Sequence, residues 1–107
     1  MNLPSPIQAY FDADGRNDDE ALIRAFAPDA VVHDEGQSHA GRQAIAAWHR
    51  AAKAKFRHVI EPREISEKDG VATVRAQVTG QFAGSPVTLS FAFRLAGGQI
   101  AVLEIRA

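Results

Sequence analysis

The sequence contains no cysteine, and this absence excludes disulfides, thiolate zinc sites and a cysteine nucleophile together. If the protein uses a nucleophile, its attacking atom is therefore oxygen or nitrogen. No segment approaches the roughly 18 consecutive apolar residues that a membrane-spanning helix needs, so no membrane association is expected. The first residues, MNLPSPIQAYFDAD, lack the basic start and apolar run of an export signal, and we expect a cytoplasmic location.

An excess of charge of either sign is also missing. The 12 basic and 13 acidic side chains give a formal net charge of −1, which leaves no broad positive field for nucleic acid or an anionic membrane surface. With 107 residues, 46% of them apolar and 23% charged, the chain has the composition of one ordinary globular domain, residues 1–107. A small, near-neutral molecule is the expected partner.

Two short helices are predicted at the start of the chain. The first is capped by Ser5 and ends at Gly15. The second begins with a capping box at Asn17, has a buried stripe that reaches Phe26, and is stopped by Pro28. Together they predict a helical hairpin.

A strand around residues 31–35 follows the hairpin, and Gly41 then opens a third helix. Apolar positions in this helix recur at intervals of three and four: Ile45, Trp48, Ala52 and Phe56. The pattern predicts one buried face along the whole helix.

From His58 onward the apolar period changes to two, which is typical of β-strands. Four segments alternate in this way between glycine-rich turns: HVIEPREISEKDG, VATVRAQVTGQF, PVTLSFAFRLAGG and QIAVLEIRA. One strand has large residues on its inner face (Leu89, Phe91, Phe93 and Leu95), and the strand before it has small ones (Ala72, Val74, Ala76 and Val78). Small residues beside large ones leave room for a hollow.

These elements predict an α+β fold. We expect three N-terminal helices packed on a strongly curved antiparallel or mixed sheet, which together form a cone with an internal pocket. Four aromatic residues are candidates both for the core and for the wall of the pocket: Trp48, Phe82, Phe91 and Phe93.

Ionisable residues follow the valines of the first strand in the stretch FAPDAVVHDEG. Successive strand residues face opposite sides, so if Asp34 points inward, His33 points outward, and the reverse holds if the register shifts. A carboxylate inside an apolar cavity loses the hydration of its charged form, which raises its pKa towards the range useful for proton abstraction next to a carbonyl. Asp34 is therefore a candidate general base, and a solvated acid at a turn is the alternative.

The segment FAPDAVVHDEG, with HAGRQAIAAW after it and GGQIAVLEI near the end, resembles the nuclear transport factor 2-like superfamily. The similarity covers nearly the whole chain and is greatest to the branch that holds SnoaL-like polyketide cyclases and ketosteroid isomerases. It implies that Asp34 is the general base and that Tyr10 donates a hydrogen bond to the developing enolate oxygen. The isomerase's second, acidic donor would fall near Phe91, and this sequence has no acid there.

The resemblance further implies a homodimer formed through the outer face of the sheet, and no cofactor. Polar residues are expected on that face: Thr73, Arg75, Gln77, Thr79, Thr88 and Ser90. The four histidines show no i, i+4 pairing and no carboxylate at a recurring ligand spacing, so no metal site is predicted.

The fold hosts several activities, and alternatives therefore stand beside a proton-abstracting isomerase or cyclase. One alternative is a noncatalytic ligand-binding or interaction domain whose hollow is filled by its own aromatic side chains. Another is a hydratase or dehydratase in which His33 or His49 shares the acid–base work. His49 flanks the buried face of the third helix, where it could reach the mouth of the pocket or lie on the surface.

Overall fold

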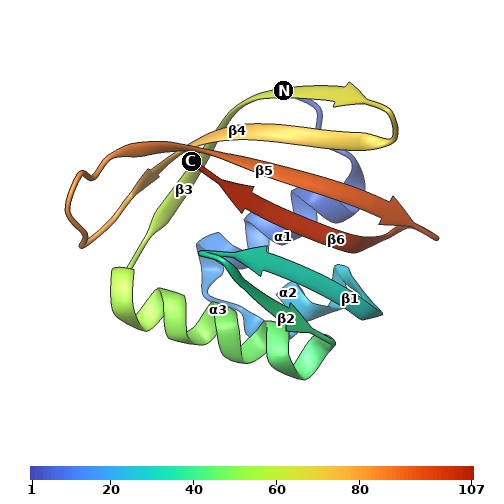
Figure 1. Cartoon of the computed structure of the whole chain (residues 1–107), viewed down its shortest axis with the longest axis horizontal. Helices are drawn as coiled ribbons and strands as arrows, with labels where there is room; N and C mark the ends of the chain where they lie inside the picture. The colour runs from blue at the N-terminus through green and yellow to red at the C-terminus, as the bar shows by residue number, and fades with distance from the viewer.

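The computed structural model describes all residues 1–107 and contains three helices and six strands (Figure 1). The elements in chain order are α1 (Ser5–Arg16), α2 (Asp19–Arg24), β1 (Phe26–Asp34), β2 (Gln37–Ala40), α3 (Arg42–Phe56), β3 (Val59–Lys68), β4 (Val71–Thr79), β5 (Val87–Ala96) and β6 (Gln99–Arg106). The predicted α+β class is confirmed.

All six strands form one sheet in the order β2-β1-β6-β5-β4-β3. The predicted antiparallel meander is present from β3 to β6, and β1 adds to β6 in parallel, so the sheet is mixed. Register shifts between Pro62 and Glu64 and between Arg94 and Leu95 bend the strands. Figure 1 shows the resulting curved sheet, with α3 packed against β1 and β2 and α1 against β3 and β6.

The core is built from the face of the sheet that the helices cover. The inner residues of β4 are all buried, as their alternation predicts (Ala72, Val74, Ala76 and Val78). Phe91 and Phe93 on β5 are buried beside them, whereas Leu95, which lies beyond the register shift, is 38% exposed. The expectation that Leu95 shares the inner face was therefore wrong, because the bulge turns the strand there.

The ends of the first two helices differ from the prediction. Helix α1 continues through Gly15 and ends where Asn17 adopts the left-handed conformation with φ 55°. The N-cap of α2 is Asp18, whose carboxylate accepts a hydrogen bond from the Ala21 amide at 3.1 Å. Phe26 begins β1 and is not part of a helix, and the short strand β2 had no signal strong enough to predict it.

Helix α3 begins after Gly41, as predicted, and this glycine has a positive φ of 87°. The helix ends at Arg57, whose left-handed conformation turns the chain towards β3. None of the three helices has the length and apolar character needed to cross a membrane.

Gly80, directly after β4, packs too tightly to carry a side chain. A Cβ there would lie 2.7 Å from the Phe56 carbonyl oxygen and 3.2 Å from the His58 Cα, and neither backbone atom can move independently. We expect Gly80→Ala to lower the free energy of unfolding by about 1–3 kcal/mol. Gly15→Ala is the matched control, because a Cβ at this helical position meets nothing within 4 Å. This substitution should raise the free energy of unfolding by about 0.5–1 kcal/mol. Urea unfolding of both variants measures the difference, and equal stabilities would contradict the packing argument.

Candidate functional site

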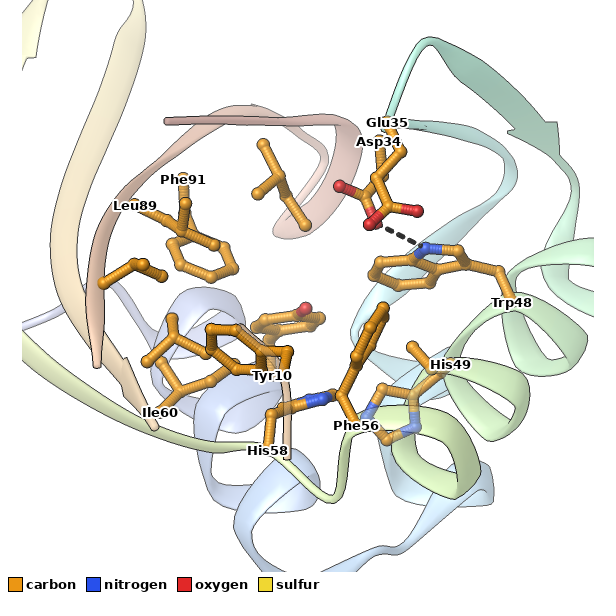
Figure 2. A pocket seen from close by; sticks show the side chains of 15 residues that line it. Tyr10, Asp34, Glu35, Trp48, His49, Phe56, His58, Ile60, Leu89 and Phe91 are labelled. Atoms are coloured by element: carbon orange, nitrogen blue, oxygen red, sulfur yellow. Dashed lines mark hydrogen bonds between the residues drawn. The ribbon is translucent and has the colours of Figure 1, made fainter. Parts of the chain in front are cut away.

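A cavity of about 350 Å³ lies between the helices and the inner face of the curved sheet (Figure 2). Its wall is mainly apolar, with 11 hydrophobic residues among 15. The lining residues are Tyr10, Asp34, Glu35, Trp48, His49, Ala52, Phe56, His58, Ile60, Val78, Phe82, Val87, Leu89, Phe91 and Ile105. The few polar groups among them determine what chemistry the site can support.

Asp34 is the last residue of β1, and its carboxylate lies on the cavity wall. Val32, two residues earlier on the same face, is fully buried, so alternation directs Asp34 inward. The indole Nε1 of Trp48 on α3 donates a hydrogen bond to Asp34 Oδ2 at 3.0 Å, as Figure 2 shows. This single neutral donor fixes the carboxylate and leaves its other oxygen free of protein partners.

Tyr10 on α1 is 1% exposed, and its ring packs edge-on against Phe11, Phe26 and Phe93 with centroid distances of 5.1, 5.8 and 5.7 Å. Its hydroxyl makes no hydrogen bond within the protein. Every fully buried polar side-chain atom does have a hydrogen-bond partner, so this hydroxyl cannot be fully buried. The hydroxyl is therefore open to the cavity, and Figure 2 shows it pointing into the central space. Three aromatic contacts hold this donor in one orientation.

Burial raises the pKa of Tyr10 well above its usual value of 10.0, and the negative charges of Asp14 and Asp34 raise it further. The phenol consequently stays protonated at physiological pH. It can donate a hydrogen bond to a ligand oxygen throughout the working range of most enzymes.

The structure brings most of the predicted site residues together. Asp34 and Tyr10 share the cavity wall with four of the predicted binding residues: Trp48, His49, Phe82 and Phe91. His33 does not reach the cavity, since it alternates to the other side of β1 and its Nδ1 lies 2.9 Å from the Ser38 hydroxyl. Phe93 does not line the cavity either, because it is fully buried in the core. Neither residue lines the cavity, and Phe93 takes only the core role predicted for it.

An unexpected polar cluster lies beneath the cavity, around the buried carboxylate of Asp14 on α1. Asp14 Oδ1 accepts hydrogen bonds from the Nε2 atoms of His49, at 2.7 Å, and His58, at 2.9 Å. Asp14 Oδ2 accepts from the Lys53 ammonium at 3.2 Å. Lys53 also donates to the His58 backbone carbonyl at 2.5 Å. The cluster joins α1, α3 and the start of β3.

His49 lies between two carboxylates. Its Nε2 faces Asp14, and its Nδ1 lies 3.0 Å from Asp19 Oδ1. Ionised carboxylates only accept hydrogen bonds, so each ring nitrogen is placed to donate to a carboxylate oxygen. His49 has no free nitrogen for a ligand, despite lining the cavity.

Burial by itself raises the pKa of Asp14, but hydrogen bonds from His49 and His58 and the nearby charge of Lys53 outweigh it and hold that pKa well below its usual range. For Asp19, the hydrogen bond from His49 lowers the pKa, helped by Arg50. Both acids are thus ionised at neutral pH. This satisfies the expectation that buried charges are paired.

The oxygen of Asp14 and the Nε2 atoms of His49 and His58 lie within 4.8 Å of one another, a spacing that a metal ion could occupy. Metal binding requires deprotonated ligands. Here both nitrogens of His49 already face carboxylate oxygens, and the Lys53 ammonium lies against the Asp14 carboxylate. The arrangement therefore works as an ion-pair network that positions side chains. The absence of a metal site stays a prediction.

The comparisons with known proteins agree with this architecture. Residues 7–103 match the family model of the SnoaL-like domain. A crystal structure of a candidate polyketide cyclase from Sinorhizobium meliloti is 51% identical, covers 97% of this chain and 95% of its own, and superimposes with a TM-score of 0.94. No curated protein matches the sequence significantly.

More distant structures share the fold at lower identity. A protein from Catenulispora acidiphila with a ketosteroid isomerase-like fold, crystallised with trimethylamine, is 20% identical over 99% of this chain and 87% of its own, with a TM-score of 0.85. A candidate polyketide cyclase from Xanthomonas campestris is 21% identical over 94% and 86%, with a TM-score of 0.81. These proteins define a class of helix-covered, curved-sheet domains. The present chain belongs to the SnoaL-like domain family, within the nuclear transport factor 2-like superfamily.

Tyr10 is the only tyrosine, so its ionisation can be followed by ultraviolet absorbance. Because its pKa is raised, we expect no tyrosinate in the native protein at pH 10, whereas the urea-unfolded chain titrates near that pH. The unfolded state loses its proton first, so this group's contribution to stability is complete below about pH 10 and declines as the pH rises. If Tyr10 ionises at the same pH in the native protein as in the unfolded chain, the phenol is hydrated and the buried position is contradicted.

Asp14→Asn should lower the free energy of unfolding by about 3–5 kcal/mol, because it removes one partner of a buried ionic network. The pKa of Asp14 is lowered on folding, so its contribution is present above about pH 4 and declines as the pH falls further. The variant should therefore lose less stability than the wild type between about pH 5 and pH 2.

The matched control for Asp14→Asn is Asp12→Asn. Asp12 lies on the same helix but is exposed, and its carboxylate accepts a hydrogen bond only from Gln8. Thermal and denaturant unfolding across the acid range should separate the two variants. If the free energy of unfolding falls equally with decreasing pH in Asp14→Asn and the wild type, the assigned network is contradicted.

Proposed function

We propose that this SnoaL-like domain binds an apolar carbonyl compound and catalyses proton transfer next to the carbonyl, in an isomerisation or an aldol-type ring closure. Asp34 is the general base and Tyr10 the hydrogen-bond donor. The observation that carries the proposal is that the Asp34 carboxylate and the open Tyr10 hydroxyl share one apolar cavity. The cavity volume of about 350 Å³ lies within the range of small-molecule sites.

In the proposed reaction, Asp34 removes a proton from the carbon beside the carbonyl. The C–H electron pair becomes the enolate, and negative charge develops on the carbonyl oxygen. A single positioned donor stabilises such an oxyanion by about 3 kcal/mol, and the raised pKa of Tyr10 keeps it in the donating form. The protonated Asp34 then returns its proton to the same carbon or to another one.

Trp48 supports the base. Its indole N–H holds one carboxylate oxygen at 3.0 Å, and the other oxygen has no partner in the protein and lies on the wall of the mainly apolar cavity. In a low-dielectric site, electrostatic interactions with the developing charge are stronger than in water. Binding free energy can then be used to align the C–H bond with the free oxygen of Asp34.

The oxyanion receives only one donor from the expected pair, because Phe91 lines the cavity where an acid would be the second. A site with one donor suits substrates whose enolate is already stabilised by a second carbonyl or an aromatic ring. Polyketide-like β-dicarbonyl compounds meet this condition better than an isolated ketone does. The 51% identical structure from S. meliloti, described as a candidate polyketide cyclase, supports the same substrate class.

The other interpretations have less support. His33 faces away from the cavity and both nitrogens of His49 are engaged, so neither residue favours hydration or dehydration chemistry. A noncatalytic binding domain filled by its own aromatic side chains fits poorly with a cavity of this size. The homodimer through the outer sheet face and the cytoplasmic location stay predictions.

Binding and turnover can be measured separately. Trp48 is the only tryptophan and lies on the cavity wall, so its fluorescence should report the binding of cyclic ketones and β-diketones. Hydrogen–deuterium exchange at the carbon beside the carbonyl, followed by NMR in D₂O, then reports proton abstraction. We expect Asp34→Asn to slow this exchange about 10²- to 10⁴-fold and Tyr10→Phe about 10²- to 10³-fold, with binding largely retained.

Asp29→Asn is the control for Asp34→Asn, since Asp29 is an exposed acid on the same strand that does not line the cavity. The Asp29→Asn variant should catalyse hydrogen–deuterium exchange of the ketone at the wild-type rate. Unchanged exchange in Asp34→Asn would exclude the assigned base. Ligand binding without any exchange in the wild type would favour the noncatalytic class.

A further inference from the structure

A second acid–base group lies on the opposite wall of the same cavity. His58 precedes β3, which is the edge strand farthest from β1 in the sheet order. Figure 2 shows His58 and Asp34 on opposite sides of the cavity, with the Tyr10 hydroxyl between them. The two groups therefore reach a bound molecule from different directions.

The His58 ring has one engaged nitrogen and one free nitrogen. Nε2 donates to Asp14 Oδ1 at 2.9 Å, whereas Nδ1 has no partner in the protein. The side chain is 12% exposed and borders both the cavity and a second, more polar pocket beside α1 and α3. Its Nδ1 is not sealed from solvent, because no fully buried side-chain nitrogen lacks a hydrogen bond. His58 lines the cavity, and this free nitrogen distinguishes it from His49.

The position of His58 is rigid. Asp14 holds the ring through Nε2, and Lys53 holds the backbone carbonyl at 2.5 Å while also contacting Asp14. An ionised carboxylate behind a histidine fixes its tautomer and stabilises its protonated form when it acts. This is the arrangement expected of a group that gives and takes protons.

We propose that His58 is the general acid of an aldol-type ring closure in this cavity, with the Nδ1 proton delivered to the oxygen of the carbonyl that is attacked. The proposal rests on the proposed function, because Asp34 and Tyr10 must first generate the enolate. It specifies the substrate class as an apolar dicarbonyl compound whose two carbonyl groups are held between the two walls.

The step balances in protons and electrons. Asp34 takes the proton beside the first carbonyl, and the resulting enolate carbon forms a C–C bond to the second carbonyl carbon. The π pair of that C=O moves to its oxygen, which takes the proton from His58 Nδ1. His58 is left neutral and Asp34 protonated, and transfer of one proton between them through solvent restores the starting state.

Isomerisation needs only one group that takes a proton and returns it nearby. Ring closure needs a base and an acid at separate positions, since the enolate forms at one carbonyl and the alkoxide at the other. The presence of a free, carboxylate-bound histidine opposite Asp34 therefore favours ring closure.

The test uses one probe, 3-acetyloctane-2,7-dione, an apolar compound whose β-diketone carbon closes onto the third carbonyl to give a five-membered ring ketol. Deuterium exchange beside its carbonyls reports Asp34 and Tyr10, and ketol formation reports the complete ring closure. For His58→Gln we expect exchange within about threefold of the wild type and ketol formation at least tenfold slower, the low end of a general acid's effect. Retained exchange in the same sample shows that the variant is folded. His33→Gln, a histidine outside the cavity, is the matched control.

Each result has a distinct meaning. Ketol formation at the wild-type rate in His58→Gln, or exchange without ketol in the wild type, overturns the role of His58 and leaves the proposed function standing. No exchange in the wild type overturns the proposed function and this inference with it. A nitrogen NMR spectrum gives a further readout without turnover. The probe should shift the His58 Nδ1 signal and leave both His49 nitrogen signals unmoved, and an unmoved Nδ1 signal contradicts the proposal.

Discussion

The buried carboxylate of Asp14 is the interaction on which the rest of the structure depends. It binds side chains from α3 and from the segment before β3, and it lies one helical turn after Tyr10 on α1. The helix that carries the phenol is thereby fixed to the helix that carries Trp48. Since Trp48 in turn holds Asp34, the orientation of the polar groups in the cavity traces back to one ionised residue.

The two inward-facing acids, Asp14 and Asp34, have opposite environments. Asp14 is enclosed by protonated partners that lower its pKa, so it is ionised and unreactive. Asp34 has a single neutral donor and an oxygen that faces an apolar space. A carboxylate with few hydrogen-bond partners is the more available of the two for accepting a proton. The environment, and not the residue type, separates the structural acid from the proposed base.

Much of the fold could be predicted because it follows from local patterns. The period-two segments predicted β3 to β6. Whether Asp34 or His33 faces inward stayed open in the sequence, and the burial of Val32 on the same face of β1 favours Asp34. The short strand β2 escaped prediction, because a four-residue polar strand depends on its partner and not on its own sequence. Asp18 replaced Asn17 as the cap because both are good capping residues and only the chain path selects one.

The cluster around Asp14 could not be found from sequence spacing. Its histidines lie 35 and 44 residues away, and the contacts arise only when α1 packs beside α3 and β3. The only early signals were a polar residue near the end of an apolar helix face and four histidines without a pattern. Long-range polar contacts of this kind depend on topology, which composition and period do not encode.

The parallel pairing of β1 with β6 also orders the events of folding. Val31 lies opposite Val102, and Phe26 opposite Ile100, so β1 has no partner for its inner edge until the last strand in the chain has been made. Pairing across such a separation closes a long loop and is slow compared with the β3–β6 hairpins. The wall that carries Asp34 is therefore completed only after the last strand has been made, so the cavity cannot form in full on a partly synthesised chain.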